Sequence, residues 1–211
     1  MWRYLHESLT MDFNDLDSRL KRLSIALDKR YELDIKPQVN ISRKVSENIY
    51  EIGFSFGAMG ETEMIERIFS VINNIASLKD HLRNKLESTG KDPMLVENMI
   101  NGSKVLSLIL DLWNQDKHGY PLKKTSRSSL NPQIINVNQG LVISNSSNKA
   151  FASFNITADS ASLASSENAA IAISGEVIDG SGKFIMSVEN MFRQAIIDLE
   201  SFLKTQGLLL G

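Results

Sequence analysis

The chain of 211 residues contains no cysteine. Disulfide bonds, thiolate metal ligands and a cysteine nucleophile are therefore excluded, and the absence fits a cytosolic protein. No apolar run approaches the roughly 20 residues needed to span a bilayer. The first residues also lack the apolar centre and the small-residue cleavage site of a signal peptide. We therefore expect a cytoplasmic protein that makes no membrane contact.

The chain also lacks a strong net charge. It carries a net charge of −2 at pH 7, with a pI of about 6.0, so a nucleic-acid contact would have to use a local basic patch. Its three histidines, His6, His81 and His118, do not have the spacing of a metal site. Gly180-Ser-Gly-Lys183 lacks the earlier glycine and the following hydroxyl residue of a phosphate-binding loop. We expect neither a metal nor another cofactor.

The first half of the chain has helical periodicity on both sides of an extended segment. Leucines at three- and four-residue spacing predict a helix over 11–33, which Lys36-Pro37 ends. Residues 38–57 are rich in β-formers and predict a strand or hairpin, with its short β element at 45–56. A long amphipathic helix is expected over 61–88.

A central, buried helix is expected next. Asp92-Pro93 is typical of a helix start, with aspartate as the N-cap. The helix would run to about Lys117, with an interruption at 101–103 where Ser103 caps it again. Its middle is apolar nearly all round. With the 61–88 helix it would form an antiparallel hairpin.

After Pro121 the composition changes to Ser, Asn, Ala and Gly. Short β-forming runs between 134 and 177 predict a small antiparallel sheet, which the 45–56 strands could join. Residues 159–168 are expected to be a mobile loop. The last helix, about 186–206, has the cleanest amphipathic face in the chain and must pack on the other helices.

These patterns predict an α+β fold: a helical bundle with a small antiparallel β-sheet inserted before the C-terminal helix. The helical body would comprise residues 1–120, the β-rich insertion residues 121–182, and the C-terminal helix residues 183–211.

A dense polar cluster closes the predicted central helix: Asn114, Asp116, Lys117 and His118. His118 can give or take a proton near neutral pH, and Lys117 can stabilise a developing negative charge. Asp116 can orient either of them. The alternative is an ordinary helix C-terminus, where Lys and His face the helix dipole and the last carbonyl groups. Taken alone, these residues favour that alternative.

A second polar stripe lies on the 61–88 helix, where Asn73, Ser77 and Asp80 recur on one side and His81 borders them. In an antiparallel hairpin that turns near residue 91, Asp80 lies about 11 residues before the turn and Asp116 about 25 after it. The two are therefore not automatically level. The interruption at 101–103 could close part of this gap, so contact between the stripe and His118 stays open.

Both polar groups resemble parts of known sequence patterns. The segment Val71-Ile-Asn-Asn-Ile-Ala-Ser-Leu-Lys-Asp-His-Leu82 is similar to a helix of uncharacterised bacterial proteins that carries His/Asn-Asn-Leu-Arg-Ser-Ala-Leu-Asp-His-Leu. A later helix of those proteins ends in Asn-x-Asp-Lys-His, matched by Asn114-Gln-Asp-Lys-His118, and strands follow it. The ending Asn114-x-x-x-His118-Gly-Tyr120 also resembles the Arg-Asn-x-x-x-His signature of HEPN domains. The resemblance covers about residues 61–120.

The resemblance to HEPN domains implies a helical bundle that is often a dimeric, metal-independent ribonuclease of toxin, antiphage or RNA-processing systems. In that family the Arg and His act on the scissile phosphate, commonly at a dimer interface. Here Trp113 occupies the arginine position, and Lys117 is the replacement cation. The roles implied are acid/base for His118, phosphate stabilisation for Lys117, and support from a larger group: Asn114, Asp116, Asp80, His81, Asn73 and Ser77.

A short basic run follows the polar cluster and includes Lys123, Lys124 and Arg127. Together with Lys117, these side chains could hold an RNA backbone by its phosphates. The alternative is solvated loop charge, and the run lacks the interleaved aromatic residues of single-strand binders.

Two function classes remain open. The first is an RNA-directed HEPN-like homodimer in a toxin or defence context, with metal-independent ribonuclease activity. The second is a noncatalytic interaction or assembly protein that meets a protein partner through its β region. In the second class the polar cluster is structural, and Trp113 at the arginine position and the acidic balance favour this class.

Overall fold

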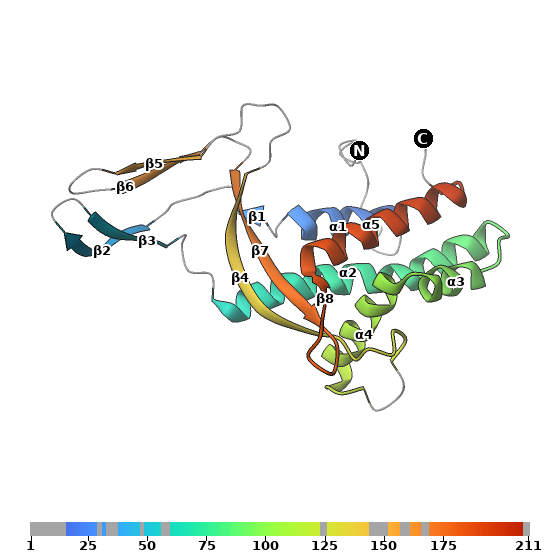
Figure 1. Ribbon diagram of the computed structural model, residues 1–211. Helices are drawn as coiled ribbons and strands as arrows, with labels where there is room; N and C mark the ends of the chain where they lie inside the picture. Colours follow the sequence, from blue (N-terminus) through green and yellow to red (C-terminus); the bar gives the residue numbers. More distant parts are fainter. Residues whose placement is uncertain are drawn as a thin grey trace.

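The protein is described from a computed structural model, which covers residues 16–28, 31–32, 38–46, 49–55, 60–122, 126–143, 152–156, 161–165 and 169–208. The fold is α+β (Figure 1). Within these ranges there are five helices, α1 (Leu16–Asp28), α2 (Glu61–Ser88), α3 (Met94–Gly102), α4 (Lys104–His118) and α5 (Val188–Thr205). The strands are β1 (Tyr31–Glu32), β2 (Gln38–Ser46), β3 (Ile49–Ser55), β4 (Gln133–Ile143), β5 (Ala152–Ile156), β6 (Ala161–Ser165), β7 (Ala169–Ile178) and β8 (Phe184–Ser187).

Helix α2 has the bounds that the periodicity predicted. Glu61 and Glu63 lie in its first turn, where acidic groups favour the helix dipole. Gly90 follows it with a φ of 72°, a conformation that glycine adopts without strain. The buried face is the apolar stripe of the sequence, from Met64 to Leu86.

The predicted 93–117 helix is two helices, with the break where it was expected. Ser103 ends α3 in extended conformation and caps α4, because its side chain accepts a hydrogen bond from the backbone N–H of Leu106. At the start of α3 the capping position is held by Pro93, not by Asp92. The Asp92 carboxylate nevertheless accepts a hydrogen bond from the N–H of Met94, at 2.8 Å. The prediction was therefore one residue off in position but right about the capping side chain.

The first helix is shorter than predicted. Helix α1 ends at Asp28, and Tyr31 lies in β1, where it is paired with Ala172 of β7. The expected helix over 11–33 was therefore wrong at Tyr31, because backbone pairing with β7 takes precedence over the leucine periodicity there. Residues 11–15 lie outside the described part of the chain.

Strands β1, β4, β7 and β8 form an antiparallel sheet with β7 at its centre, and all four come before α5 in the chain. The expectation that the 45–56 strands could join this sheet was wrong. They pair with each other as the β2–β3 hairpin, and β1 joins the sheet instead. The predicted end of the β-rich insertion at residue 182 was wrong, because 179–182 is the turn between β7 and β8 and the β region continues to Ser187.

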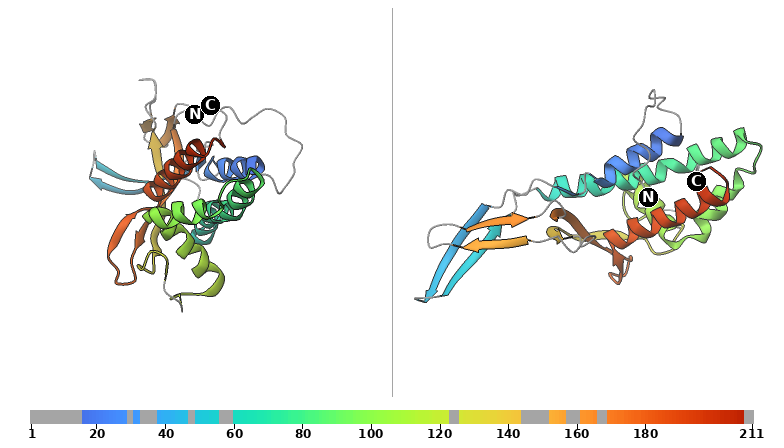
Figure 2. Two further views of the ribbon diagram at one scale, coloured as in Figure 1. Left: turned by 90° about the vertical axis from the view of Figure 1, so that its right-hand side faces the viewer. Right: turned by 90° about the horizontal axis from the view of Figure 1, so that it is seen from above.

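Two hairpins lie beyond one end of the helical body, β2–β3 and β5–β6 (Figure 2). Strand β6 falls inside the stretch that was expected to be a loop, 159–168. That expectation was wrong for Ala161–Ser165, because these residues pair with β5 in register. Serine and alanine give a weak strand pattern, so the pairing partner decides the structure here.

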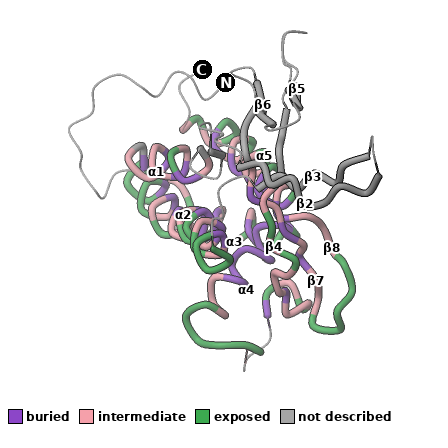
Figure 3. The backbone as a smooth tube through the Cα atoms, turned by 90° about the vertical axis from the view of Figure 1, so that its left-hand side faces the viewer, coloured by how far each residue is buried: buried purple, intermediate pink, exposed green. Residues whose placement is uncertain are grey.

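The core lies between the helices and the face of the sheet that they cover (Figure 3). On β7 the buried residues alternate, so that Ile173, Gly175 and Val177 face α5. A Cβ at Gly175 would come within 3.2 Å of the Val188 side chain, so glycine allows the start of α5 to approach the sheet. Phe192 and Met191 of α5 are almost fully buried, as the amphipathic pattern required. In the described ranges no helix is long and apolar enough to cross a membrane.

Candidate functional site

The polar cluster of the sequence forms the last turns of α4, here called the α4 tip (residues 113–118). Trp113 and Asn114 are half-buried, whereas Asp116, Lys117 and His118 are exposed. Spacing by four residues places Asn114 and His118 on one side of the helix and Trp113 and Lys117 on the next. Gly119 then ends the helix, with its N–H donated to the carbonyl of Gln115 at 2.8 Å.

Three polar side chains of the α4 tip have no bonding partner among the described residues. Asn114, Asp116 and His118 form no hydrogen bond and no ion pair with any residue that the structure describes. The last carbonyl groups are therefore not bonded by the His118 ring, and only the general attraction of Lys117 and His118 to the helix dipole remains. Side chains that do no structural work are available to a ligand.

Lys117 has one defined side-chain contact, with Trp113. Its Nζ lies 3.6 Å from the centroid of the Trp113 ring. A cation over an aromatic face at such a distance is attracted by about 0.5–1 kcal/mol at an exposed site. A positive charge is thus held beside Trp113, carried by Lys117.

No described contact joins Asn73, Ser77 or Asp80 of the α2 stripe to the α4 tip. The α2 residues from Ile75 to Leu82 face Leu106, Ile109 and Leu110 of α4 across the cavity described below. His118 lies eight residues beyond Leu110, about 12 Å further along α4. Asp80 and Asn73 are exposed and form no hydrogen bond or ion pair with described residues, and Ser77 donates to the carbonyl of Asn74. The described contacts therefore do not bring Asp80, Asn73 or Ser77 to His118.

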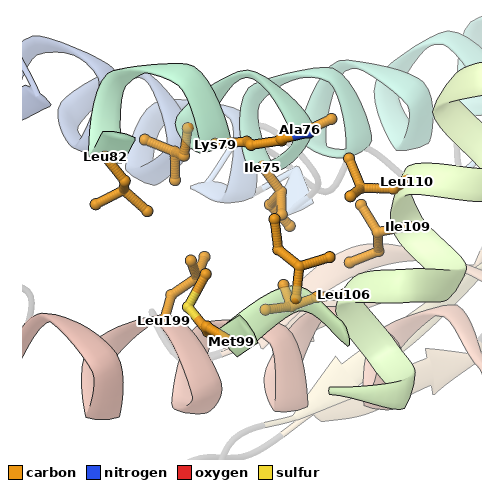
Figure 4. A pocket seen from close by; sticks show the side chains of 11 residues that line it. Ile75, Ala76, Lys79, Leu82, Met99, Leu106, Ile109, Leu110 and Leu199 are labelled. Atoms are coloured by element: carbon orange, nitrogen blue, oxygen red, sulfur yellow. The ribbon is translucent and has the colours of Figure 1, made fainter. Parts of the chain in front are cut away.

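The cavity between α2, α3, α4 and α5 is apolar and small (Figure 4). Its volume is about 20 Å³, which is room for about one water molecule. The walls are leucine, isoleucine and methionine side chains together with the stem of Lys79. A substrate does not fit there, so the exposed surfaces are the candidate sites.

Asp111 is a buried carboxylate that was not among the residues predicted from the sequence. Only 1% of it is exposed, and it accepts three hydrogen bonds from the loop after α4. These come from the N–H of Arg127 at 2.8 Å, and from the N–H and Oγ of Ser128 at 2.9 and 2.6 Å. A lone aspartate between Leu110 and Leu112 was the available signal, because a charge on an apolar helix face needs a partner.

Arg127 belongs to a second charged group, here called the Glu97 cluster (Glu97, Lys79, Arg83 and Arg127). Lys79 Nζ lies 2.7 Å from one Glu97 oxygen and Arg83 3.7 Å from the same oxygen. The Arg127 guanidinium lies 3.0 Å from the other. Burial raises the pKa of Glu97, but the hydrogen bonds and charges of Lys79 and Arg127 outweigh it and leave that pKa below its usual value. Of these four residues, only Arg127 was predicted from the sequence as a binding residue.

Other predicted site residues are placed as follows. Lys123 and Lys124 lie outside the described residues. Arg127 does not extend freely into solvent, because it also donates to the Asn101 side chain at 3.1 Å. Within the described ranges no three His, Asp or Glu side chains are arranged to hold a metal ion.

Comparison with known proteins leaves the site to be judged by its geometry. No family model, no curated protein and no solved structure matches the chain.

Proposed function

We propose that the chain is an HEPN-like protein that binds RNA through the α4 tip. The observation that carries the proposal is the set of three exposed side chains, Asp116, Lys117 and His118, that have no hydrogen bond or ion pair with described residues. Helix ends normally use such groups for capping. Here the capping is done by the backbone of Gly119, so a helix end rich in free polar groups is better explained by a ligand.

The chemistry of the α4 tip suits a phosphate. Lys117 is a cation with three donors, and its contact with Trp113 limits its freedom, so less entropy is lost when a phosphate binds. His118 can add a hydrogen bond, and in its protonated form a second positive charge. The Trp113 edge next to them offers apolar surface to a sugar or base.

Metal-independent cleavage is the activity to test on this surface. Attack of a 2′-hydroxyl on the adjacent phosphorus needs one group to take the hydroxyl proton and another to protonate the departing 5′-oxygen. One α4 tip supplies a single histidine. A homodimer with two facing tips would supply both groups, with His118 of each protomer as base or acid and Lys117 stabilising the charge on the phosphorane oxygens.

The test is binding and cleavage of a fluorescent single-stranded RNA in EDTA, with two matched variants. Lys117→Gln should weaken binding and lower the slope of log K against log salt by about 0.7, the loss of one phosphate contact. Lys104→Gln removes an exposed charge at the opposite end of the same helix and should leave both unchanged. If both variants behave alike, the α4 tip is not the RNA surface. Cleavage that survives His118→Ala would remove the catalytic role.

A second candidate is a noncatalytic assembly protein, and a feature of the sheet favours it. Strand β4 has β7 on one side, and its other edge has no partner strand among the described residues. Unpaired strand edges are templates for association. A break in register between Ile135 and Asn138 divides β4, and the longer regular segment is 138–143. Pairing of this edge with a second chain predicts that a proline at Val142 abolishes oligomers in light scattering, whereas dimers formed through facing α4 tips would survive it.

A further inference from the structure

The Glu97 cluster contains more positive charge than its carboxylate needs. Three cations surround Glu97, and one further carboxylate, Asp111, contacts the group through the backbone of Arg127, so one positive charge is in excess. The acidic residues nearest to it on α2, Asp80 and Glu87, are exposed and form no ion pair with described residues. Only 16% of the Glu97 side chain is exposed, so its charge needs a partner. A single Lys or Arg would have neutralised it.

Two of the three cations are held in place before any ligand arrives. Lys79 packs its stem along the apolar cavity and directs its ammonium group to Glu97. Arg127 is fixed at both ends: Asp111 binds its backbone N–H, and Glu97 and Asn101 bind its guanidinium group. The buried Asp111 therefore sets the position of a surface cation. Binding groups that are already ordered lose little entropy when a ligand arrives.

The third cation is the one available to a ligand. Arg83 stands 3.7 Å from Glu97, beyond hydrogen-bonding distance, and 42% of its side chain is exposed. Arg127 uses only one of its terminal nitrogens on Glu97 and Asn101. A guanidinium group has five donors. Arg83 and the remaining donors of Arg127 can therefore bind an anion while Glu97 keeps Lys79 and Arg127 in position.

We propose that the Glu97 cluster is a binding site for a phosphate monoester. A monoester carries about −1.5 to −2 charges at pH 7, whereas an internal RNA phosphodiester carries one, so the monoester is attracted more strongly to the arginines of the cluster. Its three terminal oxygens suit the planar donor groups of two arginines. The group is either that of a free nucleotide or inorganic phosphate, or the terminal phosphate of an RNA strand. This site is independent of the α4 tip.

The test is calorimetric titration of the full chain with inorganic phosphate at constant ionic strength. The wild type should bind one phosphate per chain. Arg83→Gln should weaken binding about tenfold, the value of one charge-assisted contact, and it leaves Glu97 neutralised by Lys79 and Arg127, so the variant should fold. Arg193→Gln removes an exposed arginine in an ion pair on α5 and should not alter affinity. Absence of binding by the wild type, or equal loss in both variants, would overturn the proposal.

Two further arms identify the source of the phosphate and separate this site from the proposed RNA surface. If the ligand is an RNA end, 5′-phosphorylated RNA should bind more tightly than the same RNA with a 5′-hydroxyl, and only the former should depend on Arg83. If it is a small molecule, inorganic phosphate and a nucleoside monophosphate should bind in a manner that depends on Arg83, and the 5′-phosphorylated RNA should bind no more tightly than the RNA with a 5′-hydroxyl. Phosphate affinity should survive His118→Ala, so failure of one proposal does not imply failure of the other.

Discussion

The two halves of α4 use polar residues in opposite ways. In the first half, Ser103, Ser107 and Asp111 are buried, and each has a hydrogen-bond partner. In the α4 tip, Asp116 and His118 are exposed and have none among the described residues. One continuous helix thus carries a structural polar set and a free polar set within 16 residues from its cap to its last residue.

This difference separates two reasons for a polar residue in a helix. A buried polar group must be bonded or it costs about 1–3 kcal/mol, so its partners reveal its role in the fold. An exposed polar group changes the free energy of unfolding very little. A dense cluster of such groups is therefore better explained by a ligand than by the fold. Substitutions in either half of α4 can therefore test this division.

The largest effect is expected from Asp111→Ala. The change leaves two backbone N–H groups and a hydroxyl of the loop after α4 without their acceptor. We expect the free energy of unfolding to fall by about 3 kcal/mol, measured by urea denaturation. Asp116→Ala, one and a half turns further along the same helix, should change it by less than about 0.5 kcal/mol. Equal effects would contradict the division of the helix.

A smaller effect is expected from Ser103→Ala. Ser103 caps α4 and also donates to Asp198 of α5 at 2.5 Å. Loss of the cap costs about 1 kcal/mol, and loss of a hydrogen bond to a carboxylate adds about 1.5 kcal/mol. Ser187→Ala is the matched control, because Ser187 caps α5 through Asn190 alone. If the two variants lose equal stability in thermal denaturation, the link from α4 to α5 contributes nothing.

The pH dependence of stability should reveal the Glu97 cluster. The folded state holds the pKa of Glu97 below its usual value. Its contribution is therefore complete above the unfolded pKa, about 4.3, and is lost as pH falls through the folded pKa. The stability difference between wild type and Glu97→Gln should shrink steadily below about pH 5. A difference that stays constant down to the acid limit would show that the ion pairs do not stabilise the fold.

The smallest effect on stability is expected at the α4 tip itself. His118→Ala removes a side chain with no hydrogen bond or ion pair among the described residues, so the free energy of unfolding should change by less than about 0.5 kcal/mol. Differential scanning calorimetry measures the change. A loss of 1 kcal/mol or more would assign His118 a structural role and favour the assembly protein over the RNA-binding protein.

The elements that were predicted well are those with strong local signals. Helix α2 has a long apolar stripe, and the break at Ser103 has a capping serine after a glycine. Tyr31 was missed because its structure depends on a partner distant in the chain, Ala172, and β6 was missed because its serine and alanine residues give a weak strand pattern although its partner β5 is close in sequence. Local propensity contains no information about such pairing.

The site shows the same limit. The α4 tip could be found because its residues are adjacent in the sequence. The Glu97 cluster could not, because Lys79, Glu97 and Arg127 come from two helices and a loop. Asp111 could have been found, since a single acid within an apolar helix requires a buried partner. Its partner, the loop at 126–128, could not.

The most direct test of the central claim is the NMR signal of the Trp113 indole and the His118 ring during titration with single-stranded RNA. Both lie at the α4 tip, and a Trp113→Phe variant assigns the indole. The account predicts that these two signals shift in a saturable way while the backbone amides of Ser107 and Asp111 do not. Saturable binding of RNA that leaves both signals unchanged would contradict it.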